Sequence, residues 1–233
     1  MNVIVADRFV FLHLHKSGGT FALECLRRFV PSARTIGFHL PQHRIPTEYA
    51  HLPVLGFVRN PWSYYVSWYH FQTQRPTPNI LFRILSDDGR LDFEATISNL
   101  LDLGLGSPRL DTVLAALPTD YGDNGLQLPR YALAPIRDSA QGFYSHLYAY
   151  FYGQPGPHLT VSRAEELRMQ LLSFLERVNE PVTDAMRTFV REAPRRNTSV
   201  HRPYADYYSD ELRHRVAVRD QPVIDRHQYV FGE

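Results

Sequence analysis

The stretch that decides the fold reads FVFLHL at residues 9–14, HKSGGT at residues 15–20 and FALECL at residues 21–26. The first part is an apolar, β-prone run, and the third has apolar residues at helical spacing. Between them lie two adjacent glycines, flanked by a lysine and by Ser and Thr. A strand, loop and helix in this order direct backbone N–H groups and the positive end of a helix dipole at one point. The stretch therefore predicts an anion-binding loop.

A second junction of the same kind follows further along the chain. Residues 53–58, PVLGFV, are typical of a buried parallel strand, and they end in Arg59, Asn60 and Pro61. Pro61 suits the first turn of a helix and Asn60 suits its N-cap, so we expect an aromatic helix that contains Ser67. Ligands of open α/β sheets bind at the carboxyl ends of strands. Two such junctions, each with an anion-binding group, predict a ligand with phosphates at both ends.

The whole chain, 1–233, fits one domain with a sizeable core. Residues 31–53 are irregular in pattern and rich in histidine. Residues 74–141 hold helical pieces near 80–85 and 93–103, broken by glycines and prolines, and we expect an inserted helical lid there. The rest of the chain predicts a helix at 143–151, a strand at 158–161 and two more helices at 164–178 and 183–192. A basic loop follows at 195–199, and the C-terminal part, 210–231, resembles two short helices and an apolar tail.

Composition excludes several classes of protein. Lys and Arg total 25 against 24 Asp and Glu, so no overall basic field predicts a nucleic-acid partner. No apolar run is long enough for a transmembrane segment, and Asp7 and Arg8 stand where a signal peptide would be apolar, so we expect a cytoplasmic protein. The single cysteine, Cys25, lies among apolar helix positions and is expected to be a buried thiol. His39 and His43 straddle a proline without further ligands at metal spacing, so no metal is expected.

Both junctions resemble the sulfotransferases that use 3′-phosphoadenosine 5′-phosphosulfate (PAPS). HKSGGT is similar to the family's "PKTGGT" loop, with His15 in place of the usual Pro. The segment 59–69 is similar to its "RDPxxRxxSxY" signature, with Asn60 and Tyr64 in place of Asp and Arg. The carbohydrate, Golgi-type branch and its bacterial relatives are similar in an "E-x-L" helix start and in the C-terminal part, here at 165–167, 197–199, 207–212 and 229–231.

The resemblance implies a fold and an activity. The fold is α/β, a P-loop-like three-layer sandwich with a central parallel sheet flanked by helices, with 74–141 as a helical lid that binds the acceptor. The activity is transfer of the sulfuryl group of PAPS to an acceptor hydroxyl, with 3′,5′-ADP (PAP) as product and no metal. The acceptor is expected to be a carbohydrate or another small molecule, and the sequence does not indicate an oligomeric state.

The resemblance also implies a set of site residues. Lys16 is expected to stabilise the leaving oxygen, and His39 to act as general base, with His43 or Glu48 as alternatives. Arg59 and Ser67 are expected to hold the 3′-phosphate. The full set of cofactor-binding residues is Lys16, Ser17, Gly18, Gly19, Thr20, Phe21, Arg59, Ser67, Arg195, Arg196 and Asn197.

Two other functions stay open on sequence grounds. One is a P-loop nucleotide kinase or NTPase, although Lys16 precedes the glycines instead of following them. The other is a nucleotide-binding module without catalysis, which the presence of both Lys16 and His39 disfavours.

Overall fold

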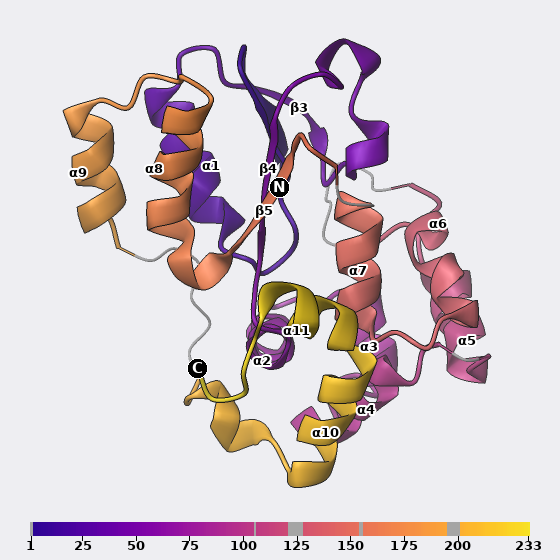
Figure 1. Cartoon of the computed structure of the whole chain (residues 1–233). Helices are drawn as coiled ribbons and strands as arrows, with labels where there is room; N and C mark the ends of the chain where they lie inside the picture. The colour runs from indigo at the N-terminus through magenta and orange to yellow at the C-terminus, as the bar shows by residue number, and fades with distance from the viewer. Residues whose placement is uncertain (1, 105, 121–127, 154–155, 195–200) are drawn as a thin grey trace. The chain divides into compact units, whose positions relative to one another are not determined.

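The structure is a computed structural model that describes residues 2–104, 106–120, 128–153, 156–194 and 201–233. The chain divides into two compact units (Figure 1). The sheet unit comprises Met1–Arg59 and Ala149–Thr198, and the helical unit comprises Asn60–Tyr148 and Ser199–Glu233. The lid role expected for 74–141 stays a prediction; that range lies within the helical unit.

The sheet unit is built on five strands in the order β3-β1-β2-β4-β5. Their bounds are β1 Asn2–Val5, β2 Val10–Phe11, β3 Arg34–Phe38, β4 Val54–Val58 and β5 Leu159–Arg163. β2, β4 and β5 pair in parallel, whereas β1 is antiparallel to both β2 and β3. Because β3 is antiparallel to β1, it runs in the same direction as β2. Four of these five strands therefore share one carboxyl edge, and the expected α/β fold with a central parallel sheet is confirmed.

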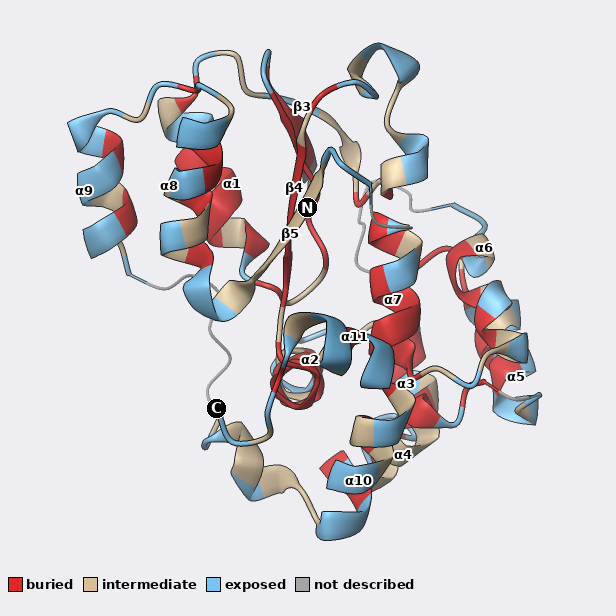
Figure 2. Cartoon of the chain, in the orientation of Figure 1, coloured by how far each residue is buried: buried red, intermediate tan, exposed pale blue. Residues whose placement is uncertain are grey.

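Helices cover the sheet with apolar side chains. One core joins Phe9, Phe11, Leu55 and Phe57 of the sheet region to α1 Gly19–Phe29, α8 Leu167–Arg177 and α9 Asp184–Glu192, which lie on one side of the sheet in Figure 1. The single cysteine is buried in this core, as expected. Figure 2 shows β4 buried along its length, which explains why its sequence is continuously apolar.

Residues 31–53 contain more regular structure than the sequence indicated. β3 forms there, followed by the 3-10 turns η1 Gln42–Arg44 and η2 Thr47–Tyr49. The sequence pattern of this segment therefore did not indicate β3. This strand lies at the end of the sheet order and is exposed to intermediate in burial, so its sequence lacks the apolar pattern of a buried strand.

The helical unit contains the predicted aromatic helix, α2 Pro61–Thr73, and most of α7 Phe143–Tyr152. Asn60 caps α2 by accepting hydrogen bonds from Trp62 N and Ser63 N, and its amide nitrogen donates to Val230 O at 3.0 Å. An aspartate could not donate this last bond, which explains why an asparagine suits position 60. The other helices are α3 Ile80–Leu85, α4 Phe93–Leu101, α5 Pro108–Ala116, α6 Arg130–Leu133, α10 Asp210–Arg219 and α11 Gln221–His227, with 3-10 turns η3 Ala134–Asp138 and η5 Tyr204–Tyr207; in the sheet unit, η4 Ala164–Glu166 precedes α8.

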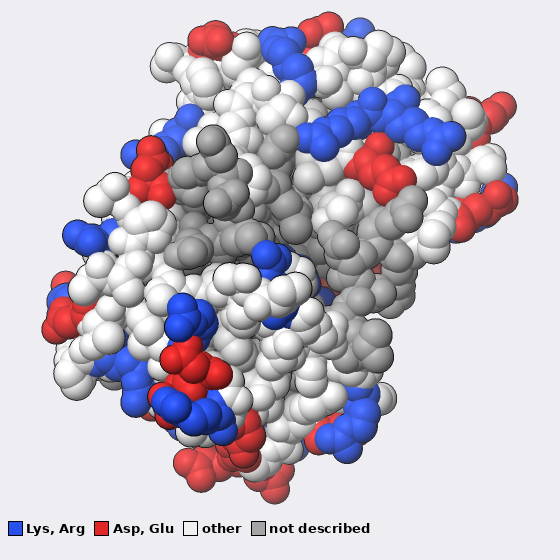
Figure 3. Space-filling view, turned by 180° about the vertical axis from the view of Figure 1, so that it is seen from behind, with Lys and Arg blue, Asp and Glu red and all other residues white. Residues whose placement is uncertain are grey.

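No helix among the described residues is both long and apolar enough to cross a membrane. Acidic and basic side chains are interspersed over the face seen in Figure 3, in keeping with a net charge of +1.

A buried carboxylate joins three elements of the helical unit. Asp220 is fully buried; it accepts hydrogen bonds from Tyr65 Oη at 2.6 Å and from Ser145 N at 2.7 Å. Burial raises the pKa of Asp220 to about 6, although both hydrogen bonds act in the opposite direction. The network therefore positions α2, α7 and α10, but it carries a charge where the surroundings disfavour one.

We predict that Asp220 makes the fold less stable as the pH rises from about 4 to about 6. The folded state holds the proton more tightly than the unfolded chain, so the stabilisation is present below pH 4 and is lost above pH 6. Two pKa units correspond to about 3 kcal/mol. In Asp220→Asn, which keeps an acceptor for Ser145 N, the free energy of unfolding should lose this dependence in urea titrations at pH 4 and pH 7.

The matched control is Asp225→Asn, because Asp225 is exposed in α11. It should retain the wild-type difference between the two pH values. Equal pH dependence in wild type and Asp220→Asn would contradict the prediction.

Candidate functional site

The candidate site lies at the carboxyl edge of the sheet. β2 pairs in parallel with β4, with Val10 opposite Val54 and Phe11 opposite Leu55, so the chain leaves both strands on the same side. His13, His15 and Lys16 follow β2, Arg59 directly follows β4, and His39 directly follows β3, which runs in the same direction. The topology therefore gathers residues from three separate parts of the sequence.

The loop after β2 owes its shape to its glycines. Gly18 has φ +77° and is the N-cap of α1, and a Cβ there would lie 2.6 Å from Leu167 Cδ1 of α8. Gly19 is the first residue of α1, and a Cβ there would overlap the imidazole of His13. The first turn of α1 contains no acidic residue, so its positive end is not neutralised from within that turn. The loop is thus closely packed and suited to an anion.

Two cations meet at this loop. Arg59 Nη1 donates a hydrogen bond to the carbonyl oxygen of Lys16 at 3.4 Å, across 43 positions of sequence. Burial, and next to it the charge of Arg59, lowers the pKa of Lys16 to about 7. The Lys16 backbone is also in the left-handed region, with φ 59°. Two like charges held together at a strained position are stabilised when an anion binds between or beside them.

His39 is enclosed at the same edge. Its side chain is 1% exposed, its backbone has φ 45°, and its Nδ1 lies 3.2 Å from the carbonyl oxygen of His13. Because a carbonyl only accepts, Nδ1 carries the proton and Nε2 carries the lone pair. Burial, followed by the neighbouring imidazoles of His15 and His13, keeps the pKa of His39 well below its usual value. The ring is therefore neutral at physiological pH and can accept a proton at Nε2.

His15 and His13 complete the group of imidazoles. The rings of His15 and His39 are stacked, with centroids 3.8 Å apart and planes 15° apart, and the centroids of His13 and His39 are 5.6 Å apart. Among the described residues, no group of three or more His, Cys, Asp or Glu side chains could hold a metal ion. Burial lowers the pKa of His15 to about 3 and that of His13 well below its usual value.

The other predicted site residues differ in their placement. Ser17 is buried in the loop, where its Oγ donates to His15 O, and Thr20 lies in the first turn of α1. Phe21 belongs to the core of the sheet unit, where its ring stacks on Phe189. Ser67 is buried in α2 of the helical unit, so its part in the site stays a prediction. Arg195, Arg196 and Asn197 lie outside the described residues.

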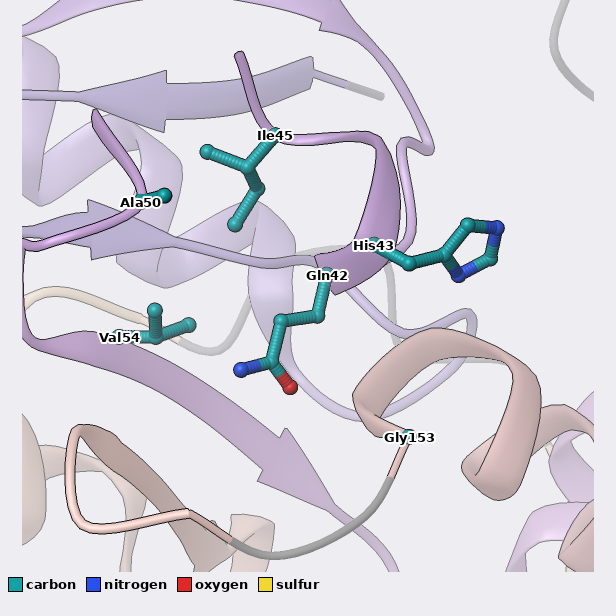
Figure 4. A pocket seen from close by; sticks show the side chains of 6 residues that line it. All are labelled: Gln42, His43, Ile45, Ala50, Val54 and Gly153. Carbon is teal, nitrogen blue, oxygen red and sulfur yellow. The ribbon is translucent and has the colours of Figure 1, made fainter. Parts of the chain in front are cut away.

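The alternative bases lie elsewhere in the sheet unit. His43 in η1 and Glu48 in η2 are both exposed. A cavity of about 350 Å³ is lined by Gln42, His43, Ile45, Ala50, Val54 and Gly153 (Figure 4). Figure 4 shows the amide of Gln42 between Val54 and Gly153 and the imidazole of His43 directed away from them. Val54 begins β4 whereas Arg59 follows its last residue, so these two residues mark opposite ends of that strand.

Sequence reasoning did not assign His13 and His15 to the site. Their spacing of two positions after an extended run was an available signal, because alternate residues of a strand point to the same face. The contact with His39, 24 positions beyond His15, could not be read from any local pattern.

Comparisons with known proteins bear on the fold. No family model matches this chain, and no curated protein matches it in sequence. Among solved structures, the chain is similar to the mouse sulfotransferase SULT7A1 complexed with PAP, at 13% identity, with a TM-score of 0.50, covering 90% of this chain and 80% of that one. The chain has a sulfotransferase-like fold. At this identity the likeness extends to the fold alone.

We predict that Gly19→Ala destabilises the sheet unit. The added methyl group would overlap the His13 ring, which is itself enclosed, so the ring or the start of α1 must shift. Overpacking of this kind typically costs about 1–3 kcal/mol. Denaturant unfolding measures the loss, and a change in the His13 imidazole resonances in NMR spectra would locate it.

Gly156→Ala is the matched control in the same unit. A Cβ at Gly156 would have no atom of the described residues within 4 Å. The free energy of unfolding of this variant should lie within about 0.5 kcal/mol of the wild-type value. Equal destabilisation by the two substitutions would show that the His13 contact is not the cause.

Proposed function

We propose that this chain is a PAPS-dependent sulfotransferase that moves a sulfuryl group to an acceptor hydroxyl. The observation that carries the proposal is the meeting of Lys16 and Arg59 at the carboxyl edge of the sheet, beside the start of α1. Paired cations at a glycine-containing loop are suited to a ligand with more than one anionic group. The fold shared with a PAP-bound sulfotransferase supports this assignment.

The donor set fits PAPS in its chemistry. Lys16, the loop of Ser17 to Thr20 and the positive end of α1 would hold the 5′-phosphosulfate, and Arg59 would hold the 3′-phosphate with two N–H groups. Ser67 is proposed to add a hydroxyl to the 3′-phosphate. Phe21, Arg195, Arg196 and Asn197 complete the proposed set of nucleotide-binding residues.

In the proposed reaction the acceptor oxygen attacks sulfur in line with the bond to the 5′-phosphate oxygen. The new S–O bond forms as the old one breaks, and the electron pair of the broken bond leaves with PAP. Lys16 would stabilise the negative charge that develops on this leaving oxygen. The acceptor proton passes to Nε2 of His39, whose Nδ1–H is held by His13 O. The acceptor is proposed to be a carbohydrate or another small hydroxyl compound, and labelled PAPS with a panel of glycans, phenols and lipids would identify its class.

We predict that PAP binds to the wild-type chain and binds about 10- to 100-fold more weakly to Lys16→Met and Arg59→Met. Each substitution removes a charged hydrogen bond, for which about 1.5–3 kcal/mol is typical. Isothermal titration calorimetry measures the affinity. Arg187→Ala is the control, since Arg187 is an exposed residue of α9 paired with Glu176. Binding of ATP with Mg²⁺ but not of PAP would contradict the proposal and favour a kinase.

The affinity for PAP should fall as the pH rises from about 7 to about 9. In the free protein Lys16 has a pKa of about 7, and a bound anion raises it, so binding takes up a proton in this range. Once free Lys16 is neutral, recharging it opposes binding. Titrations in buffers of different ionisation enthalpy would detect the proton, and Lys16→Arg should remove the dependence because arginine stays charged.

We predict that His39→Ala lowers turnover by about 10²- to 10⁴-fold, as expected for loss of a general base, and changes the affinity for PAP little. Initial rates with labelled PAPS measure the first effect, and calorimetry the second. His51→Ala serves as control, because His51 is exposed and has no proposed role. A wild-type rate in His39→Ala would assign the base elsewhere, and a loss confined to His43→Ala or Glu48→Ala would name it.

A further inference from the structure

We propose that His15 is a positioning residue that holds the imidazole of His39 in a single orientation and keeps it uncharged before the acceptor is bound. The proposal rests on the proposed function for the role of His39, but it concerns a contact that can be measured without turnover. His15 stands where the similar "PKTGGT" loop has a proline, whose side chain has no imidazole to stack on His39.

The packing around His39 leaves its ring little freedom. His15 covers one face, with ring centroids 3.8 Å apart and planes 15° apart. Phe151 meets both imidazoles edge-on, at 5.5 Å from His15 and 6.1 Å from His39, and Phe38 meets His39 edge-on at 4.7 Å. The hydrogen bond from Nδ1 to His13 O fixes the remaining rotation. Removing the His15 ring would open one entire face of His39.

Stacking also couples the charges of the two rings. Two imidazoles at this separation in an apolar enclosure cannot both be protonated without strong repulsion. Nδ1 of His15 is buried and makes no hydrogen bond to the described part of the chain, so a proton there would be an unsatisfied donor. His15 is therefore held neutral, and a neutral stacked ring excludes water from His39.

Neighbouring groups of the sheet unit act on the pKa of His39. After burial, the imidazoles of His15 and His13 lower it, while the hydrogen bond to His13 O acts in the opposite direction. Lys16, in the same loop, acts on His15 and His13. Loss of the His15 ring would admit water to one face of His39. Hydration of this face favours protonation of His39.

The test compares His15→Ala with His15→Phe in the full chain. Phenylalanine keeps a stacked ring but cannot titrate. Nitrogen-proton correlation spectra of the His39 imidazole report its tautomer and its pKa directly. In His15→Ala we expect the pKa of His39 to rise towards its usual value of about 6.5, at which kcat/KM at pH 6 is about 4-fold lower than at pH 8. In His15→Phe the spectra should stay as in wild type, with kcat within about 3-fold.

The outcomes separate this proposal from the proposed function. Unchanged His39 spectra in His15→Ala would overturn the positioning role whatever the activity. A loss of turnover in His15→Phe as large as in His39→Ala would also overturn it, since His15 would then itself take the proton. Changed spectra without sulfuryl transfer to any acceptor would support the contact and reject the proposed function. His51→Ala controls for the loss of any imidazole, because His51 is exposed.

Discussion

The parallel pairing of β2 with β4 is the constraint on which the site depends. Both strands are buried, and their register is set by Val10 opposite Val54, Phe11 opposite Leu55 and the hydrogen bond from Leu12 N to Leu55 O. A slip of one residue would turn every apolar side chain of a strand to the other face, so the core of the sheet unit enforces this register. The same register decides where each strand ends. It therefore places Lys16 and Arg59 together, although they are 43 positions apart.

Close packing converts that placement into a rigid loop. Gly18 and Gly19 allow Leu167 and His13 to approach the backbone where any side chain would collide. Lys16 and His39 adopt positive φ, which costs about 1–3 kcal/mol for each residue and persists only where surrounding structure enforces it. The enforcing structure is the core beneath α1 and α8. The positions with backbone strain thus include the two to which sequence reasoning gave catalytic roles.

Sequence patterns predicted those parts of the structure that depend on local chemistry. β4 and the helices α2, α3 and α8 have continuous or periodic apolar residues, and their bounds agree within a few positions. β3 has no such pattern because it is an edge strand, and its strand character comes from pairing with β1. The stacked pair of His15 and His39 also comes from three-dimensional packing alone. The glycines and the lysine of the loop, in contrast, could be identified from the sequence, because an anion-binding loop requires these residue types at short spacing along the chain.

The electrostatics of the carboxyl edge explain why a binding loop and a base belong together. Burial lowers the pKa of Lys16 and of all three imidazoles, so the edge holds its titratable groups closer to neutrality than water would. An anion bound there reverses this preference, because its field favours the charged form of every nearby base. In the proposed function, the donor would thus restore the charge of Lys16 and strengthen His39 as a proton acceptor at the same time. Binding of the donor in the nucleotide site would then itself prepare His39 to accept a proton, without any movement of the backbone.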